Sequence, residues 1–150
     1  MAEGLRHILV PMDFSPASTT ALERGKMLAE RFAARLSLLH VMTDPQARGT
    51  WTAEIHVPAI PEVRDRLQVS VDAKAGAVAE QILEVARTHH IDLIVMGTHG
   101  RRGLAHLVMG SIAERVVREA PCAVMTTHAA HAGTGAATEA QPVAPIATAG

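Results

Sequence analysis

The chain has 150 residues, of which 48% are hydrophobic and only 2% aromatic, and its formal net charge is −1. This length suits one domain with a sizeable core. The aromatic residues Phe14, Phe32 and Trp51 are too few for the stacking platforms of a single-stranded nucleic-acid binder, and the net charge offers no attraction for a polyanion. We therefore expect no nucleic-acid partner.

The single cysteine, Cys122, rules out an internal disulfide. We expect it to be a small core side chain rather than a reactive thiol. The first residues contain no apolar run of signal-sequence length, and no segment has the length of a membrane span. These features predict a cytoplasmic protein without a membrane partner.

The first predicted elements are a strand, a helix and a second strand. The apolar run His7–Asp13 predicts a buried strand. The helix that follows has Ser15 as its N-cap and Pro16 at its first position. Its apolar positions recur at helical spacing, at Ala21, Leu22, Gly25, Leu28, Ala29, Phe32 and Ala33. The second buried strand covers Leu36–Met42.

The segment from Thr43 to Arg66 interrupts this regularity. It contains Pro45, Gly49, Pro58 and Pro61, too many helix breakers for one full helix. We expect an irregular loop with at most a shortened or broken second helix.

The second half alternates again, with strands at Leu67–Asp72, Ile91–Gly97 and Cys122–Thr127 and helices at 75–90 and 111–120. Apolar strands that alternate with helices predict an α/β fold, an open five-stranded parallel sheet with helices on both faces. Residues 1–128 would form this one domain. Residues 129–150 are rich in Ala, Gly, Thr and Pro and predict a disordered tail; His128 and His131, near its start, are given no role.

Several notable residues follow predicted strands. In an open parallel sheet, ligands bind beyond the carboxyl ends of the strands, where Asp13, Val41 and Met96 fall. A stretch with four glycines, residues 97–110, then leads into a helix whose Ser111 and Glu114 match the S-x-x-E capping box. Such a helix start binds anions, and Arg101 and Arg102 could add charge-assisted hydrogen bonds.

The glycine pattern matches neither the Walker A loop G-x-x-x-x-G-K-[ST] nor the dinucleotide fingerprint G-x-G-x-x-G. Instead, "GTHG" at 97–100 is followed by nine residues and then by "GS" at 110–111. This spacing resembles the ATP-binding branch of the universal stress protein family, which has a Rossmann-like fold of the adenine nucleotide α-hydrolase type. The resemblance runs from about Leu5 to Met125 and includes "ILVPMDFSPAS" and "LSLLHV", but the proline-broken middle departs from the family's full second helix.

The resemblance implies a set of nucleotide-binding residues. The triphosphate would be held by Gly97, His99, Gly100, Gly110, Ser111 and Ile112. Pro11 and Asp13 would lie beside the nucleotide, and the apolar side chains of Val41 and Met96 would sandwich the adenine. The implied cofactor is ATP with Mg²⁺ or Mn²⁺, the metal sitting on phosphate oxygens with Ser111 or Asp13. No catalytic residue and no separate metal site are predicted.

Three functions remain open. The first is a nucleotide-binding regulatory module of a stress response. The second is an ATPase or adenylating enzyme, but the chain has "PMDFSPAS" where that class has a Ser-Gly-Gly-x-Asp-Ser loop, so weak hydrolysis is the most we expect. The third is an interaction protein that acts through its dimer and binds no nucleotide. The phosphate motif favours the first function, without separating ATP from AMP or a cyclic nucleotide.

The last strand also bears on assembly. It is expected at the edge of the sheet, where unpaired backbone groups invite pairing. In the resembling family this strand pairs with its twin, which implies a homodimer through Ala123 to Thr126.

Overall fold

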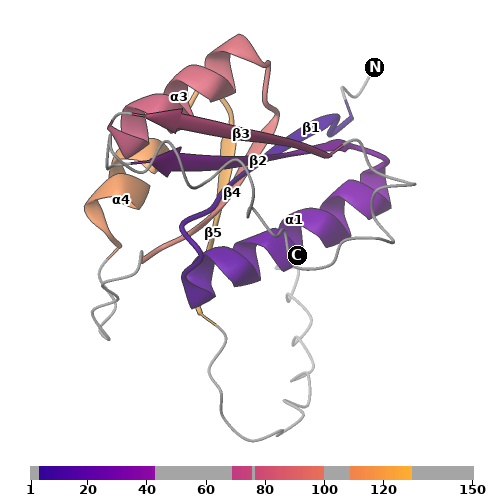
Figure 1. Cartoon of the computed structure of the whole chain (residues 1–150). Helices are drawn as coiled ribbons and strands as arrows, with labels where there is room; N and C mark the ends of the chain where they lie inside the picture. Colours follow the sequence, from indigo (N-terminus) through magenta and orange to yellow (C-terminus); the bar gives the residue numbers. More distant parts are fainter. Residues whose placement is uncertain (1–3, 43–68, 76, 100–108, 130–150) are drawn as a thin grey trace, which may run out of the picture.

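The computed structural model describes residues 4–42, 69–75, 77–99 and 109–129, without the side chains of residues 42 and 69–75. The elements are β1 (His7–Pro11), α1 (Pro16–Phe32), β2 (Arg35–Met42), β3 (Val69–Ala75), α3 (Val78–Thr88), β4 (Leu93–Gly97), α4 (Ser111–Glu119) and β5 (Ala123–Thr127) (Figure 1). This order confirms the predicted alternation of strands and helices. The proline-rich segment 43–66 and residues 130–150 of the predicted tail lie outside the described residues.

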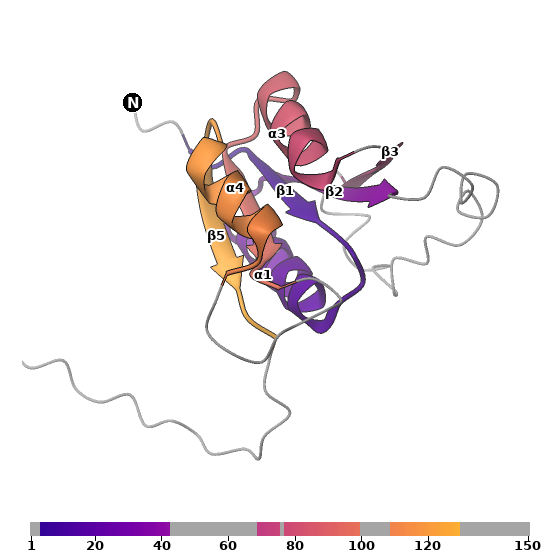
Figure 2. The ribbon, with the colours of Figure 1, turned by 90° about the vertical axis from the view of Figure 1, so that its left-hand side faces the viewer.

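The five strands form one parallel sheet with the order β3-β2-β1-β4-β5. The fold class is therefore as predicted, and β5 lies at an edge. α1 covers one face of the sheet, whereas α3 and α4 cover the other (Figure 2). The helices that follow the neighbouring strands β1 and β4 lie on opposite faces of the sheet. In open α/β sheets, ligands bind beside such a switch point, beyond the carboxyl ends of the strands.

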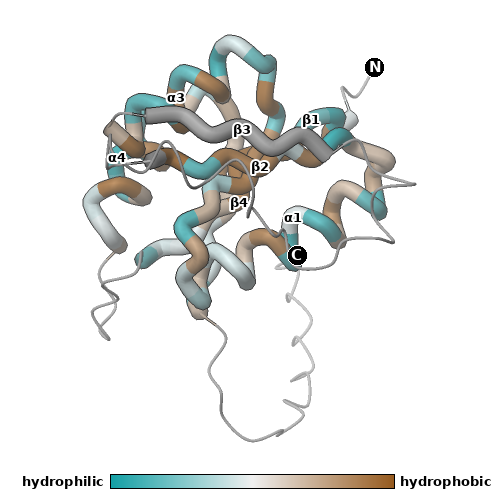
Figure 3. The backbone as a smooth tube through the Cα atoms, in the orientation of Figure 1, coloured by the Kyte–Doolittle hydropathy of each residue, from teal (hydrophilic) through white to brown (hydrophobic). Residues whose placement is uncertain are grey.

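Each face of the sheet has its own buried cluster. Ile8 and Val10 of β1 pack toward α1, whereas Leu9, between them, packs toward α3 and α4. All three side chains are fully buried. In Figure 3 the helices alternate between hydrophilic and hydrophobic residues. Strands covered on both faces are largely apolar. This apolar character made the strands predictable.

The start of α1 matches its prediction, but its end does not. Ser15 is the N-cap and Pro16 the first helical residue. A Cβ at Gly25 would lie 2.7 Å from Val10 Cγ2, so this glycine lets α1 approach the sheet. Phe32 and Ala33, predicted on the buried face, are exposed, because the helix ends at Phe32 and Ala33 turns the chain with φ 52°.

Cys122 lies partly buried beside the cluster under α3 and α4. Burial, together with the negative charge of Asp92, raises the pKa of its thiol. A raised pKa means less thiolate, and Cys122 packs against the margin of this cluster rather than inside the core. Among the helices described, none is long and apolar enough to cross a membrane.

Candidate functional site

The carboxyl edge of the sheet brings together almost all the predicted site residues. Asp13 follows β1, Val41 lies near the end of β2, and Met96 and Gly97 close β4. The start of α4 at Gly110 is hydrogen-bonded to the same edge. Gly100 lies outside the described residues, as do Arg101 and Arg102.

The Asp13 carboxylate is hydrogen-bonded at the start of α1. Its Oδ1 accepts a hydrogen bond from the backbone N–H of Ser15 at 2.9 Å. Burial raises the pKa of the Asp13 carboxyl, but hydrogen bonds from Ser15 and Ser18 outweigh burial and hold that pKa below its usual value. Asp13 is therefore a stable carboxylate and a weak base.

Val41 and Met96 are apolar residues on the α3 and α4 side of the sheet, near the ends of β2 and β4. Both are buried, and both belong to the cluster on that face. Val41 lies two residues beyond Leu39, which pairs with the last residue of β1. Because β1 runs between their strands, the two residues lie roughly two strand spacings apart across the sheet, about 10 Å, and Val41 also lies two residues further along the strand direction.

Gly97 has a structural reason to lack a side chain. A Cβ at this position would lie 2.8 Å from Ala17 Cβ and 3.0 Å from the Ala17 carbonyl carbon. The first turn of α1 therefore occupies the space that any side chain would need. Close packing of α1 on β4 is a role for Gly97 that the sequence motif did not predict.

Gly110 joins the start of α4 to the end of β4. Its N–H donates to the carbonyl oxygen of Thr98 at 2.8 Å, and a Cβ at Gly110 would lie 3.0 Å from that oxygen. Gly110 is also the N-cap of α4, which makes Ser111 the first helical residue. The predicted capping box is therefore wrong, and Glu114 instead pairs with Arg118 at 3.7 Å.

The start of α4 is open. A helix leaves its first N–H groups without intrahelical acceptors, and in α4 these include the N–H groups of Ser111, Ile112 and Ala113. Within the described part of the chain, no side chain accepts a hydrogen bond at this cap. Ser111 and Ile112 are also exposed. Together with the positive end of the helix dipole, these donors suit an anion.

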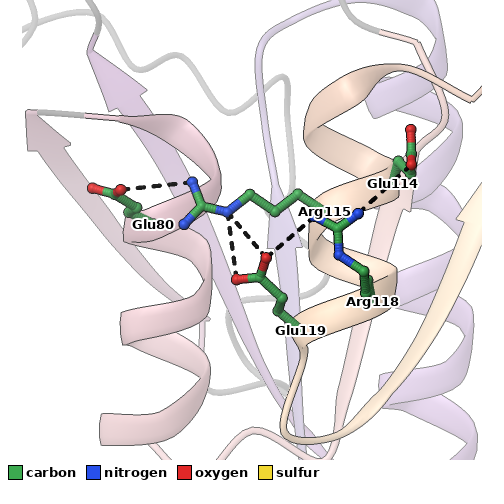
Figure 4. A network of polar contacts seen from close by, with 5 residues as sticks. All are labelled: Glu80, Glu114, Arg115, Arg118 and Glu119. Atoms are coloured by element: carbon green, nitrogen blue, oxygen red, sulfur yellow. Dashed lines mark hydrogen bonds and ion pairs between the residues drawn. The ribbon is translucent and has the colours of Figure 1, made fainter.

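Contacts on both sides of α4 hold it in place. Ala113 and Val116 are buried in the cluster beneath it. On its outer side, Arg115 reaches Glu80 of α3 at 3.6 Å and Glu119 at 3.4 Å, and the network extends through Arg118 to Glu114 (Figure 4). Exposed ion pairs contribute little each, so the buried face supplies most of the anchoring.

A polar cluster next to Gly97 was not predicted. The hydroxyl oxygen of Thr98 lies 3.0 Å from His99 Nδ1 and 3.1 Å from His128 Nδ1, and it donates to the Thr127 carbonyl at 3.3 Å. His99 Nε2 is buried, and among the described residues it has no hydrogen-bond partner. His128, to which the sequence assigned no role, is therefore part of this edge. Only the pairing of β4 with β5 brings it there, so no local signal could have found it.

The opposite, amino edge has a depression of about 590 Å³ that none of the predicted site residues lines. Within it, His7 Nδ1 donates to the His89 carbonyl at 3.1 Å, and Nε2 lies 2.7 Å from Ser37 Oγ. Burial lowers the pKa of His7. The Asp92 carboxylate accepts the N–H groups of Arg6 and His7. These contacts join β1 to the end of α3.

Comparisons with known proteins agree with this architecture. The model of the universal stress protein family matches residues 4–128. A universal stress protein of Thermus aquaticus is 48% identical over 130 residues, which cover 79% of this chain and 95% of the relative. Universal stress protein MJ0531 of Methanocaldococcus jannaschii is 30% identical over 136 residues, 80% of each chain.

Solved structures show the same fold. A universal stress protein in complex with cAMP has a TM-score of 0.64 at 23% identity, over 85% of this chain and 99% of the other. An Arabidopsis thaliana protein of the family, with AMP bound, has a TM-score of 0.59 at 19% identity, over 82% and 91% of the two chains.

Proposed function

The chain belongs to the universal stress protein family, and from this premise we propose that it binds an adenine nucleotide at the carboxyl edge of its sheet. The ligand we favour is ATP with Mg²⁺ or Mn²⁺, and the role we favour is a regulatory module of the stress response. The observation that carries the proposal is the open start of α4, fastened to β4 through Gly110 and Thr98.

The phosphates would occupy the space in front of α4. The N–H groups of Ser111 and Ile112 and the Ser111 hydroxyl are donors suited to phosphate oxygens. The bare Cα of Gly110 lets a phosphate approach the backbone closely. Gly97, His99 and Gly100 would complete the cradle from the end of β4.

The adenine would lie against Val41 and Met96. Their side chains are apolar and belong to the same buried cluster, and apolar side chains suit a flat ring more than a charged group. Pro11 is the last residue of β1, and Asp13 follows it. Because β1 lies between β2 and β4, which carry Val41 and Met96, both residues would border the nucleotide.

The residues present fit a cation carried by the nucleotide. Among the described residues, no three His, Cys, Asp or Glu side chains are grouped to hold a metal ion. Asp13 and Ser111 offer the oxygen ligands that Mg²⁺ and Mn²⁺ accept beside phosphate. When bound, the cation would neutralise part of the triphosphate charge.

Binding without efficient catalysis is the function this site supports best. A general base works best with a pKa near the working pH, whereas the pKa of Asp13 lies below its usual value. The cAMP and AMP in the two solved relatives support the class of ligand, adenine nucleotides, without separating ATP from the monophosphates.

Thermal unfolding with ATP–Mg²⁺, AMP, cAMP and GTP in parallel tests the proposal. A ligand at about one hundred times its dissociation constant stabilises the fold by roughly 2.7 kcal/mol, which raises Tm by several degrees. We expect the largest rise with ATP–Mg²⁺. No rise with any nucleotide would contradict the proposal, and phosphate release in the same samples would measure hydrolysis.

We also propose a homodimer through β5. β5 is an edge strand, and its Met125 side chain is 38% exposed. On the adjacent α4, Ile112 and Val117 are also exposed, at 41% and 45%. An apolar edge of this kind is suited to pairing with a second copy. Light scattering at micromolar concentration should give twice the monomer mass, and Met125→Lys should halve it. A monomer mass for the unmodified protein would contradict the dimer.

A further inference from the structure

The last residue of β5, Thr127, is joined to two other elements at the carboxyl edge of the sheet. Its side chain is buried, and its hydroxyl donates to the carbonyl oxygen of Ala17 at 3.1 Å. The Met96 carbonyl oxygen, 3.4 Å away, is a second acceptor for the same proton. These contacts tie the end of β5 to the first turn of α1 and to the end of β4 (Figure 1).

The Ala17 carbonyl does not need the Thr127 hydroxyl as its donor. Ala17 lies inside α1, where a carbonyl accepts the N–H of the residue four positions further on. A buried hydroxyl costs free energy unless it is hydrogen-bonded, and valine would suit a buried strand position of this size. The Thr127 hydroxyl is therefore an additional, directional tie between α1 and the sheet.

The backbone of Thr127 continues this tie toward α4. Its carbonyl oxygen accepts the N–H of Thr98 at 2.9 Å and the Thr98 hydroxyl at 3.3 Å. The carbonyl oxygen of Thr98 in turn accepts the N–H of Gly110 at 2.8 Å. Gly110 is the N-cap of α4, so this path of hydrogen bonds connects the first turn of α1 to the start of α4.

The path supplies the direction that apolar packing under α4 lacks. Ala113 and Val116 bury the inner face of α4, but burial of apolar surface is not directional. Hydrogen bonds weaken steeply as their geometry departs from its optimum, so donors to a phosphate must be held to within about half an ångström. The hydrogen bond from Gly110 to Thr98 fixes the helix start, and Thr127 fixes Thr98.

We propose that Thr127 is a positioning residue of the nucleotide site, an inference that rests on the proposed nucleotide binding. It acts through Thr98 and Gly110, by setting where the donors of α4 lie relative to the turn between β1 and α1. Without its hydroxyl, the first turn of α1 and the end of β4 can shift against each other. The nucleotide must then restore their alignment, and the free energy of ordering the site is lost from the affinity.

Titration calorimetry of the full chain with ATP–Mg²⁺ tests this role. Thr127→Val keeps the shape of the side chain but removes the hydroxyl, and we expect about fivefold weaker affinity, the scale of one hydrogen bond. Thr127→Ser keeps a hydroxyl and should bind ATP to within about twofold of the unmodified protein. Unchanged affinity in the valine variant, or an equal loss in the serine variant, overturns the proposal.

Ser37→Ala is the matched control. Ser37 is also a buried hydroxyl residue, but its Oγ lies 2.7 Å from His7 Nε2, at the amino edge of the sheet. Its loss should lower the urea midpoint of unfolding, as Thr127→Val does, and leave ATP affinity unchanged. An equal loss of affinity in both variants would make general destabilisation the cause and overturn the role of Thr127.

Hydrogen exchange of the unliganded protein tests the path without nucleotide. The Gly110 N–H should exchange about fivefold faster in Thr127→Val than in the unmodified protein, because its acceptor is held less firmly. In Ser37→Ala its rate should stay the same. An unchanged rate at Gly110 in Thr127→Val overturns the path.

Thr98→Val takes the place of Thr127→Val in both measurements if the latter does not fold, because it removes the other hydroxyl of the path. Absence of binding heat from the unmodified protein overturns the nucleotide proposal, and with it the effect on affinity. The exchange rates then still decide whether Thr127 holds the start of α4.

Discussion

The two helix starts at the carboxyl edge of the sheet are built differently. At α1, the Ser15 hydroxyl accepts the Ser18 N–H at 3.2 Å, Pro16 has no N–H to satisfy, and Asp13 accepts the Ser15 N–H. At α4, Gly110 is the N-cap, and no described side chain accepts from the first turn.

The difference separates a structural helix start from one available to a ligand. α1 is capped by its own side chains, with the N–H groups of Ser15 and Ser18 accepted by Asp13 and Ser15. α4 begins after its N-cap Gly110, whose N–H is hydrogen-bonded to the Thr98 carbonyl, and its first turn leaves donors facing outward. Four predictions test this contrast.

Gly97→Val should have the largest effect on stability. Its side chain would meet the backbone of Ala17, which cannot move without shifting α1. We expect a loss of about 3 kcal/mol in the free energy of unfolding, measured in urea. Gly4→Val is the control, because nothing lies within 4 Å of its Cβ, and it should change stability by less than about 0.5 kcal/mol. Equal stability of the two variants would refute this role for Gly97.

Gly110→Val should act on the open helix start. Its backbone angles, φ −62° and ψ 152°, are allowed for valine, but the new Cβ would lie 3.0 Å from the Thr98 carbonyl oxygen, so we expect the fold to survive with a loss of about 2 kcal/mol. The side chain would fill the phosphate cradle and lower ATP affinity at least about tenfold, or 1.4 kcal/mol. Gly110→Ala should lose less. Unchanged ATP affinity in the valine variant would rule out this position for the phosphates.

The paired variants Ser15→Ala and Ser111→Ala compare the helix starts directly. Removing the Ser15 cap should cost about 1 kcal/mol in the free energy of unfolding. Ser111 makes no cap, so its loss should change stability by only a few tenths of a kcal/mol while weakening nucleotide binding. An equal stability cost at both positions would restore the capping box at Ser111.

The smallest effect concerns pH. Because the pKa of Asp13 is lowered on folding, its carboxylate stabilises the fold above the ordinary carboxyl pKa of 3.8, and this stabilisation is lost as the pH falls through the lower folded value. The stability difference between the unmodified protein and Asp13→Asn should therefore shrink below about pH 4. Glu30→Gln, an exposed substitution on α1, is the control variant for this comparison.

Local patterns predicted what local forces determine. The buried strands and the start of α1 follow from runs of apolar residues and from the Ser15-Pro16 pair. The start of α4 could not be assigned in the same way, because "GSIAE" allows either Gly110 or Ser111 as N-cap. The hydrogen bond to Thr98, from another element, selects Gly110.

The same limit applies to the candidate site. The motif placed Val41, Met96 and the α4 start at one edge, since parallel strands all end there. It could not show that Ala17 fills the space beside Gly97, nor that His128 reaches Thr98. Both contacts join residues far apart in the chain, and a single sequence carries no signal for them.

The central position of β1 has a consequence for synthesis. β1 is the first strand to be made, yet one of its two neighbours is β4, and the Asp92 carboxylate that ties down the N–H of Arg6 comes 86 residues later. At ribosomal speed that interval is on the order of ten seconds. Throughout it, the apolar strand of Ile8 and Val10 has an unpaired edge on which another nascent chain can add. The order of the strands therefore sets how long each new molecule needs protection from its neighbours.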